Sequence, residues 1–116
     1  MHFGTHIRER RTRLAEKDSA YSLRQVAGRV GIQPSYLSQI ERGEQPAPGE
    51  DAIRAIAHEL GEDPDVLLAM AGKVSSDIQE IIRRRPALFA TLIRQLKTLP
   101  DNAVLRIVQD VRDGEW

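Results

Sequence analysis

The chain has 116 residues, 41% of them hydrophobic, so its length allows one small domain with a short appendage. It contains no cysteine, which excludes disulfides and thiolate zinc sites and fits a cytoplasmic location, and its apolar runs are too short to cross a membrane. The 17 basic and 17 acidic residues balance overall, but residues 1–45 hold eight basic against five acidic residues, an asymmetry that fits either a DNA-facing side or ordinary scatter.

A first helix is expected from Gly4 or Thr5 to Lys17, with Thr5 as a possible N-cap. Ile7 and Leu14 recur at helical spacing and should therefore face the core. This helix lies in the basic part of the chain.

A second helix is expected from Leu23 to Val30, because Ser22 can cap its start and its apolar residues share one face. Gly31 follows the last of these apolar positions. A glycine there ends a helix in a left-handed conformation at no steric cost. The sequence thus predicts a tight turn at Gly31.

A third helix opens at Gln33, with Pro34 in its first turn, where a missing N–H costs nothing. Leu37 and Ile40 point toward the core, and Gly43 ends the helix. The outward residues are amides, hydroxyls and one arginine, which suit base edges and phosphates in a DNA major groove. They are Gln33, Ser35, Tyr36, Ser38, Gln39 and Arg42.

These two helices resemble the helix-turn-helix of the phage Cro/CI repressor family, also called the XRE family. The resemblance is carried by Ala27, Gly31, the apolar positions and the run Y-L-S-Q-I-E-R-G at residues 36–43, and it covers roughly Phe3–Gly72. It implies an all-α fold: a five-helix repressor-like DNA-binding domain over residues 1–72, with the third helix in the major groove.

Within this family resemblance, Gln33, Ser35 and Gln39 are the candidates for base contacts. Gln39 comes first, because one Gln amide can bond adenine N6 and N7 together. The loop of residues 44–48 runs along the DNA backbone in the family. It has no Lys or Arg here, so its phosphate contacts would come from backbone N–H groups or from Gln45. The other candidates for phosphate contacts, which position a protein without reading sequence, are Arg24, Gln25, Tyr36, Ser38 and Arg42.

The family often pairs an arginine of the first helix with the glutamate late in the recognition helix. By spacing from Ile7 these residues are Arg11 and Glu41, and a buried pair would fix the angle between the two helices. The alternative is that Arg11 is a solvated surface base. The chain also departs from the family, because Arg10 stands where leucine is common and the link over residues 12–20 is longer than usual. In that link Asp18-Ser19-Ala20 forms either an added loop or an extension of the first helix.

Two further helices complete the domain, from Pro48 or Gly49 to Leu60, ended by Gly61, and from Asp63 to about Ala71, with Pro64 in its first turn.

The tail, residues 73–116, is predicted to form three amphipathic helices that start at Ser75 or Ser76, at Pro86 and at Pro100, the last capped near Thr98 or Leu99. Arg83-Arg84-Arg85 is expected to be a helix-end charge cluster rather than a phosphate contact. Short helices seldom bury their apolar faces alone, so the tail should either cap the core or form a homodimer. A dimer would match a palindromic operator with half-sites about 34 Å apart. The dimerisation candidates are Leu88, Phe89, Leu92, Leu105 and Val108.

The sequence therefore indicates a sequence-specific transcriptional regulator, a repressor that binds double-stranded DNA as a homodimer without a cofactor. The alternative is an antitoxin or switch protein whose main role is to bind a protein partner. That partner would be a toxin, or a metallopeptidase that cuts the tail of this chain near A-V-L-R-I-V. An enzyme is not favoured, because no Gly-rich phosphate loop, metal-ligand cluster or Ser/His/Asp set is evident. The three histidines are scattered, and His2 and His6 lie where the N-terminus would fray.

Overall fold

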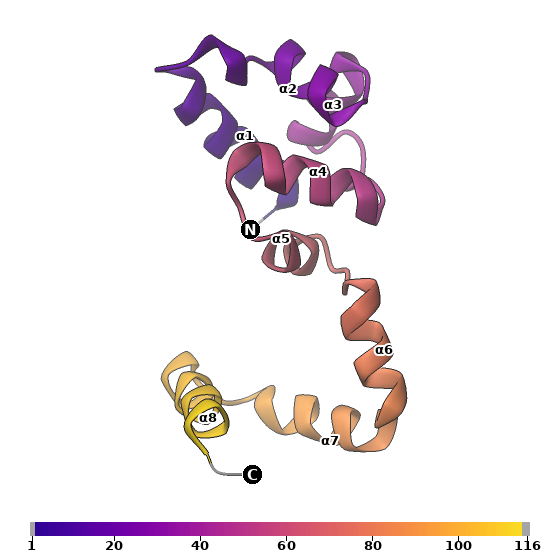
Figure 1. Ribbon diagram of the computed structural model, residues 1–116, viewed down its shortest axis with the longest axis vertical. Helices are drawn as coiled ribbons and strands as arrows, with labels where there is room; N and C mark the ends of the chain where they lie inside the picture. The colour runs from indigo at the N-terminus through magenta and orange to yellow at the C-terminus, as the bar shows by residue number, and fades with distance from the viewer. Residues whose placement is uncertain (1, 115–116) are drawn as a thin grey trace. The chain divides into compact units, whose positions relative to one another are not determined.

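The computed structural model describes residues 2–114, and over that range it contains eight α-helices, one 3₁₀ turn and no strand (Figure 1). The chain divides into two compact units, Met1–Ser76 and Asp77–Trp116. The helices of the first unit are α1 (Phe3–Ala15), α2 (Leu23–Val30), α3 (Pro34–Glu41), α4 (Glu50–Leu60) and α5 (Pro64–Met70).

The first unit packs around a single hydrophobic core to which all five of its helices contribute. Leu14, Tyr21 and Ile32 are among the partly buried residues that pack against this core. The buried set follows the helical spacing of the sequence, which is why each helix presents one apolar face inward. It consists of Phe3, Ile7, Val26, Ala27, Leu37, Ile40, Ile53, Ile56, Ala57, Leu60, Leu67 and Leu68.

Helix α1 begins earlier than the sequence predicted. Its N-cap is His2, which makes no side-chain capping bond, and Thr5 lies inside the helix rather than at its cap. The physical reason is burial, because Phe3 is only 7% exposed and Gly4 is buried beside it. Packing of the first turn on the core thus replaces a capping side chain in fixing the start of α1.

The link after α1 forms a separate turn rather than an extension of the helix. α1 ends at Ala15, and Asp18 caps the 3₁₀ turn η1 (Ser19–Tyr21) by accepting a hydrogen bond from the Ala20 N–H. Arg29 of α2 holds this turn in place. It donates to the Ala20 carbonyl and to Glu59 of α4, both at 2.6 Å.

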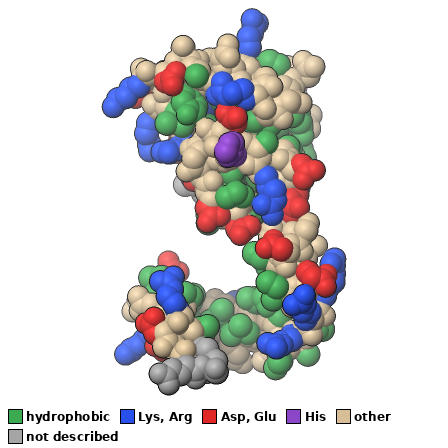
Figure 2. Space-filling view, in the orientation of Figure 1, with side chains coloured by type: hydrophobic (Ala, Val, Ile, Leu, Met, Phe, Trp, Pro, Cys, Tyr) green, Lys and Arg blue, Asp and Glu red, His purple; other side chains and the backbone are tan. Residues whose placement is uncertain are grey.

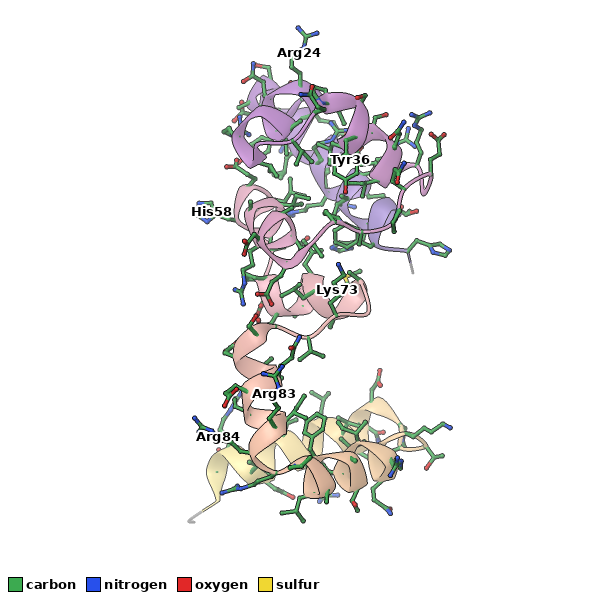
Figure 3. The ribbon with its side chains drawn as sticks, turned by 90° about the vertical axis from the view of Figure 1, so that its right-hand side faces the viewer. Arg24, Tyr36, His58, Lys73, Arg83 and Arg84 are labelled. Carbon is green, nitrogen blue, oxygen red and sulfur yellow. The ribbon has the colours of Figure 1, made fainter. Side chains whose placement is uncertain are left out.

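The first unit runs to Ser76 and so includes the segment that follows α5. Lys73 Nζ donates to the Pro48 carbonyl at 2.7 Å (Lys73 is labelled in Figure 3). Ser76 donates to the Glu50 carboxylate through its N–H at 2.9 Å and through its hydroxyl at 2.8 Å. These bonds attach the segment after α5 to the start of α4.

The second unit has three helices and no buried core. The helices are α6 (Ser76–Arg84), α7 (Pro86–Leu96) and α8 (Asp101–Asp113), and none of their described residues is buried. The N-cap of α8 is Pro100, whereas the sequence suggested Thr98 or Leu99. Hydrophobic side chains lie on the surface of this unit (Figure 2). The large exposed ones are Ile81, Leu88, Leu92, Ile93, Leu99, Leu105, Ile107, Val108 and Val111. Within residues 2–114, no helix has the length and the apolar character that crossing a membrane requires.

Candidate nucleic-acid interface

The α2–turn–α3 segment has the geometry of a helix-turn-helix. Ser22 caps α2 by accepting from the Gln25 N–H at 3.3 Å, and Gly31 ends it with a φ of 87°, a left-handed conformation that favours glycine. Pro34 then starts α3, after Gln33 as N-cap. Since Leu37 and Ile40 are buried in the core, the opposite face of α3 points outward.

The outward face of α3 presents polar side chains that the rest of the protein does not use. Gln33 and Ser35 are exposed and Gln39 is half-buried. Within residues 2–114, none of these three side chains has a hydrogen-bond partner. Their donors and acceptors are therefore available to an external ligand, as reading of base edges requires.

An ion pair between α1 and the end of α3 fixes the orientation of this face. Arg11 Nε donates to Glu41 Oε2 at 2.7 Å and Arg11 Nη2 to Glu41 Oε1 at 2.9 Å, so the pair is bidentate. The two side chains are 11% and 4% exposed. Arg11 Nη1 also donates to the Tyr21 carbonyl at 3.2 Å, which ties the α1–α2 link to the same pair.

The candidate phosphate contacts lie on both helices of the helix-turn-helix. Arg24 and Gln25 are exposed in the first turn of α2, and Arg24 projects into solvent (Figure 3). Tyr36 and Ser38 are half-buried on α3. Arg42 is exposed at the C-cap of α3.

The loop after α3 uses two of its backbone N–H groups inside the protein. The backbone N–H groups of Glu44 and Gln45 both donate to the Gln39 carbonyl, at 2.8 and 3.2 Å. These N–H groups are thus already used inside the protein and are not free for phosphates. The Gln45 side chain remains exposed. Glu44 forms an ion pair with Arg42, at 3.0 Å.

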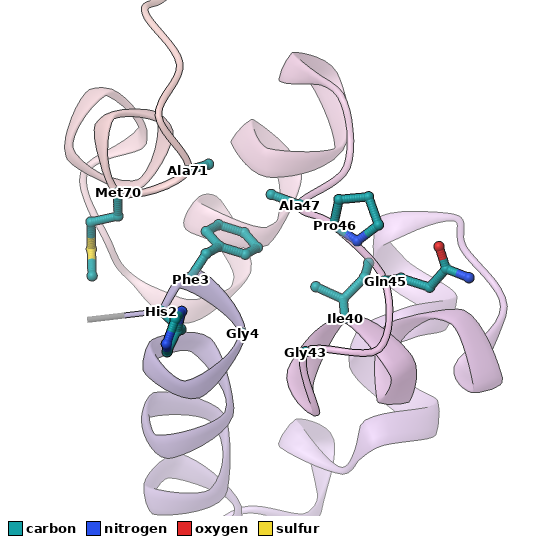
Figure 4. Close-up of a pocket in the computed structure, with 10 residues that line it drawn as sticks. All are labelled: His2, Phe3, Gly4, Ile40, Gly43, Gln45, Pro46, Ala47, Met70 and Ala71. Carbon is teal, nitrogen blue, oxygen red and sulfur yellow. The ribbon is translucent and has the colours of Figure 1, made fainter.

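A cavity of about 300 Å³ lies between the start of α1, the loop after α3 and the end of α5 (Figure 4). Phe3, Gly4 and Ile40 contribute to its wall. A Cβ atom added at Gly4 would collide with the backbone carbonyl of Ile40 and lie 3.1 Å from that of Glu41. The glycine therefore allows α1 to approach the end of α3 closely, a role that the sequence reading missed.

His6 and Arg10 connect α1 to the turn between α4 and α5. His6 is not in a frayed terminus, as the sequence suggested, because its Nε2 lies 3.2 Å from Glu62 Oε1. Arg10 Nε donates to the Leu60 carbonyl at 3.0 Å and lies 3.8 Å from Glu62. An arginine in place of the usual leucine thus binds a free carbonyl at the end of α4.

No group of three or more metal-ligating side chains occurs among residues 2–114. The structure shows Arg83 of the arginine cluster near Glu80, at 3.4 Å, one helical turn away.

A family model described as a helix-turn-helix domain matches residues 2–70 of the chain. This match covers more than half of the sequence, and the chain belongs to that family. It spans α1 to α5 and stops before the second unit. No curated protein and no solved structure matches the chain. Helix-turn-helix domains are typical of DNA-binding regulators, which place the second helix of the motif in the major groove.

Proposed function

We propose that the chain is a sequence-specific transcriptional repressor of the Cro/CI type that works in the cytoplasm and inserts α3 into the major groove. The observation that supports this most is the outward face of α3. Gln33, Ser35 and Gln39 have no partner within the described residues, while the Arg11–Glu41 pair holds their helix in one orientation. A rigid helix with free amide and hydroxyl groups suits direct reading of base edges.

Gln39 has the central role in this proposal. Its amide nitrogen can donate to N7 of an adenine while its amide oxygen accepts from the N6 amino group of the same base, which makes one bidentate contact. Gln33 and Ser35 read the neighbouring positions. Phosphate contacts fix the register without adding sequence information, and they come from Arg24, Gln25, Tyr36, Ser38 and Arg42.

We further propose that the second unit forms a homodimer. Its helices have no buried residue, and Leu88 and Leu105 are 70% and 60% exposed. A groove of about 240 Å³ with an apolar lining runs between α6 and α7, and Phe89 and Leu92 contribute to it. Covering such faces with those of a second copy removes apolar surface from water, which is the main driving force for association. Val108 extends the apolar surface along α8.

A dimer would also let the protein recognise a longer DNA sequence. One short helix contacts only a few base pairs, whereas two copies related by a two-fold axis read two half-sites about 34 Å apart. The proposed operator is therefore a palindrome with that spacing.

The test is to select bound sequences from random duplex DNA with the full chain and to measure the mass of the complex. The expected result is an enriched palindrome bound by two copies. If no sequence is enriched, the base-reading role of α3 is wrong, and a protein-holding role becomes the better explanation. A palindrome bound by one copy would contradict the dimer alone.

A further inference from the structure

Arg42 is the only Lys or Arg between Arg29 and Arg54, so it supplies the whole basic character of α3 and its following loop. Its guanidinium is not free. Nη1 lies 3.0 Å from Glu44 Oε1, and Nε donates to the Ser38 carbonyl at 3.3 Å. The charge at this end of the recognition helix is therefore locally balanced.

The backbone places Glu44 beside Arg42. Gly43 has a φ of 75°, which turns the chain back at the end of α3. The Glu44 N–H then donates to the Gln39 carbonyl at 2.8 Å and fixes the position of the residue. The two side chains are about half exposed, 49% for Arg42 and 52% for Glu44, so a ligand in solution can reach the arginine.

A carboxylate and a phosphate offer a guanidinium the same kind of charged oxygen acceptor. We propose that Glu44 competes with DNA phosphate for Arg42 and so lowers the affinity of this protein for all DNA sequences. The inference rests on the proposed function of α3. The Glu44 carboxylate occupies Nη1 of Arg42 and neutralises part of the charge that the guanidinium offers a phosphate, and it also repels that phosphate.

The competition carries no sequence information, because it concerns a phosphate contact. It should weaken specific and non-specific binding by the same factor and leave discrimination between bases to Gln39 and its neighbours. Exposed ion pairs are weak, so the expected effect is about two- to fivefold in affinity.

The experiment compares the full-length wild type with Glu44→Gln, Arg42→Gln and the double variant. Binding of a fluorescent random-sequence 30-base-pair duplex is measured over a range of salt concentrations. Glu44→Gln should raise the affinity about two- to fivefold and steepen the plot of log K against log salt by up to about one unit, because Arg42 then neutralises a phosphate fully. In the Arg42→Gln background the same change should have no such effect.

Glu16→Gln is the matched control. Glu16 is an exposed acid with no partner among the described residues, so this variant changes the net charge equally without touching Arg42. If Glu44→Gln does no more than Glu16→Gln, or lowers the affinity, the inference is wrong; in the second case Glu44 orients Arg42 for DNA. A wild-type chain that binds neither this duplex nor any sequence in the selection overturns the proposed function, and the inference with it.

Discussion

The Arg11–Glu41 pair gives the sharpest prediction about the stability of the DNA-binding unit. Replacing Arg11 with Met leaves the Glu41 carboxylate, whose side chain is 4% exposed, without either of its two hydrogen bonds. Replacing Glu41 with Leu leaves Arg11 with one bond, to the Tyr21 carbonyl, and with a side chain that is 11% exposed. Both variants therefore bury an uncompensated charge.

Removing one partner of a buried pair costs about 3–5 kcal/mol, and two hydrogen bonds to charged groups give a similar total at about 1.5–3 kcal/mol each. We expect Arg11→Met to lie near the upper end of this range, because Glu41 keeps no partner. Glu41→Leu should lie near the lower end. The double variant should be closer to the wild type than either single variant, because it buries no charge.

Urea unfolding of the full chain, followed by circular dichroism at one protein concentration, measures these differences. A small domain has a total stability of about 5–15 kcal/mol, so the single variants should show clearly lower midpoints. If both single variants lose less than about 1 kcal/mol, the value of a surface pair, the assignment of a buried pair is refuted. It is also refuted if the double variant loses as much as the sum of the two.

Three further predictions concern packing, base reading and assembly. Gly4→Ala should lower the free energy of unfolding by about 1–3 kcal/mol, because the added Cβ collides with a backbone carbonyl of α3. Gly28→Ala is the matched control: this glycine is exposed in a helix and no atom lies near its added Cβ, so the change should raise the free energy of unfolding by up to about 1 kcal/mol. Urea unfolding measures both. Gln39→Ala should relax the preference at one base pair by about 1–3 kcal/mol, measured by competition between duplexes, and an unchanged preference would contradict its role. Leu88→Asp places a charge on a large hydrophobic residue of α7 that is 70% exposed. It should shift sedimentation from dimer to monomer while circular dichroism keeps its helical signal; a retained dimer would contradict the proposed interface.

Local signals in the sequence were enough to place α2 and α3. Ser22 and Gly31 bound α2 as predicted, and the proline at the start of α3 also stands where expected. Capping and left-handed termination depend on neighbouring residues only, so they can be recognised without a structure. The family pattern likewise identified Arg11 and Glu41 as possible partners, and the structure brings them to 2.7 Å.

Features that depend on distant parts of the chain could not be predicted in this way. The start of α1 is fixed by burial of Phe3 and by the approach of Gly4 to α3, not by a cap. The contact of His6 with Glu62 joins residues that are far apart in sequence.

Under this proposal the first unit lacks strong DNA affinity as a single copy, and the second unit lacks a cover for its apolar surface. The recognition helix has one cation, and Glu44 partly balances it, so a single copy should hold DNA weakly. The second unit has amphipathic helices with no buried residue among the described ones, and the proposed partner surface would cover their apolar side. Joining two copies through that unit meets both needs, because the second recognition helix then binds at a high effective concentration. Weak binding by each copy makes occupancy of the operator depend steeply on dimer formation, so any process that separates the copies would release the DNA.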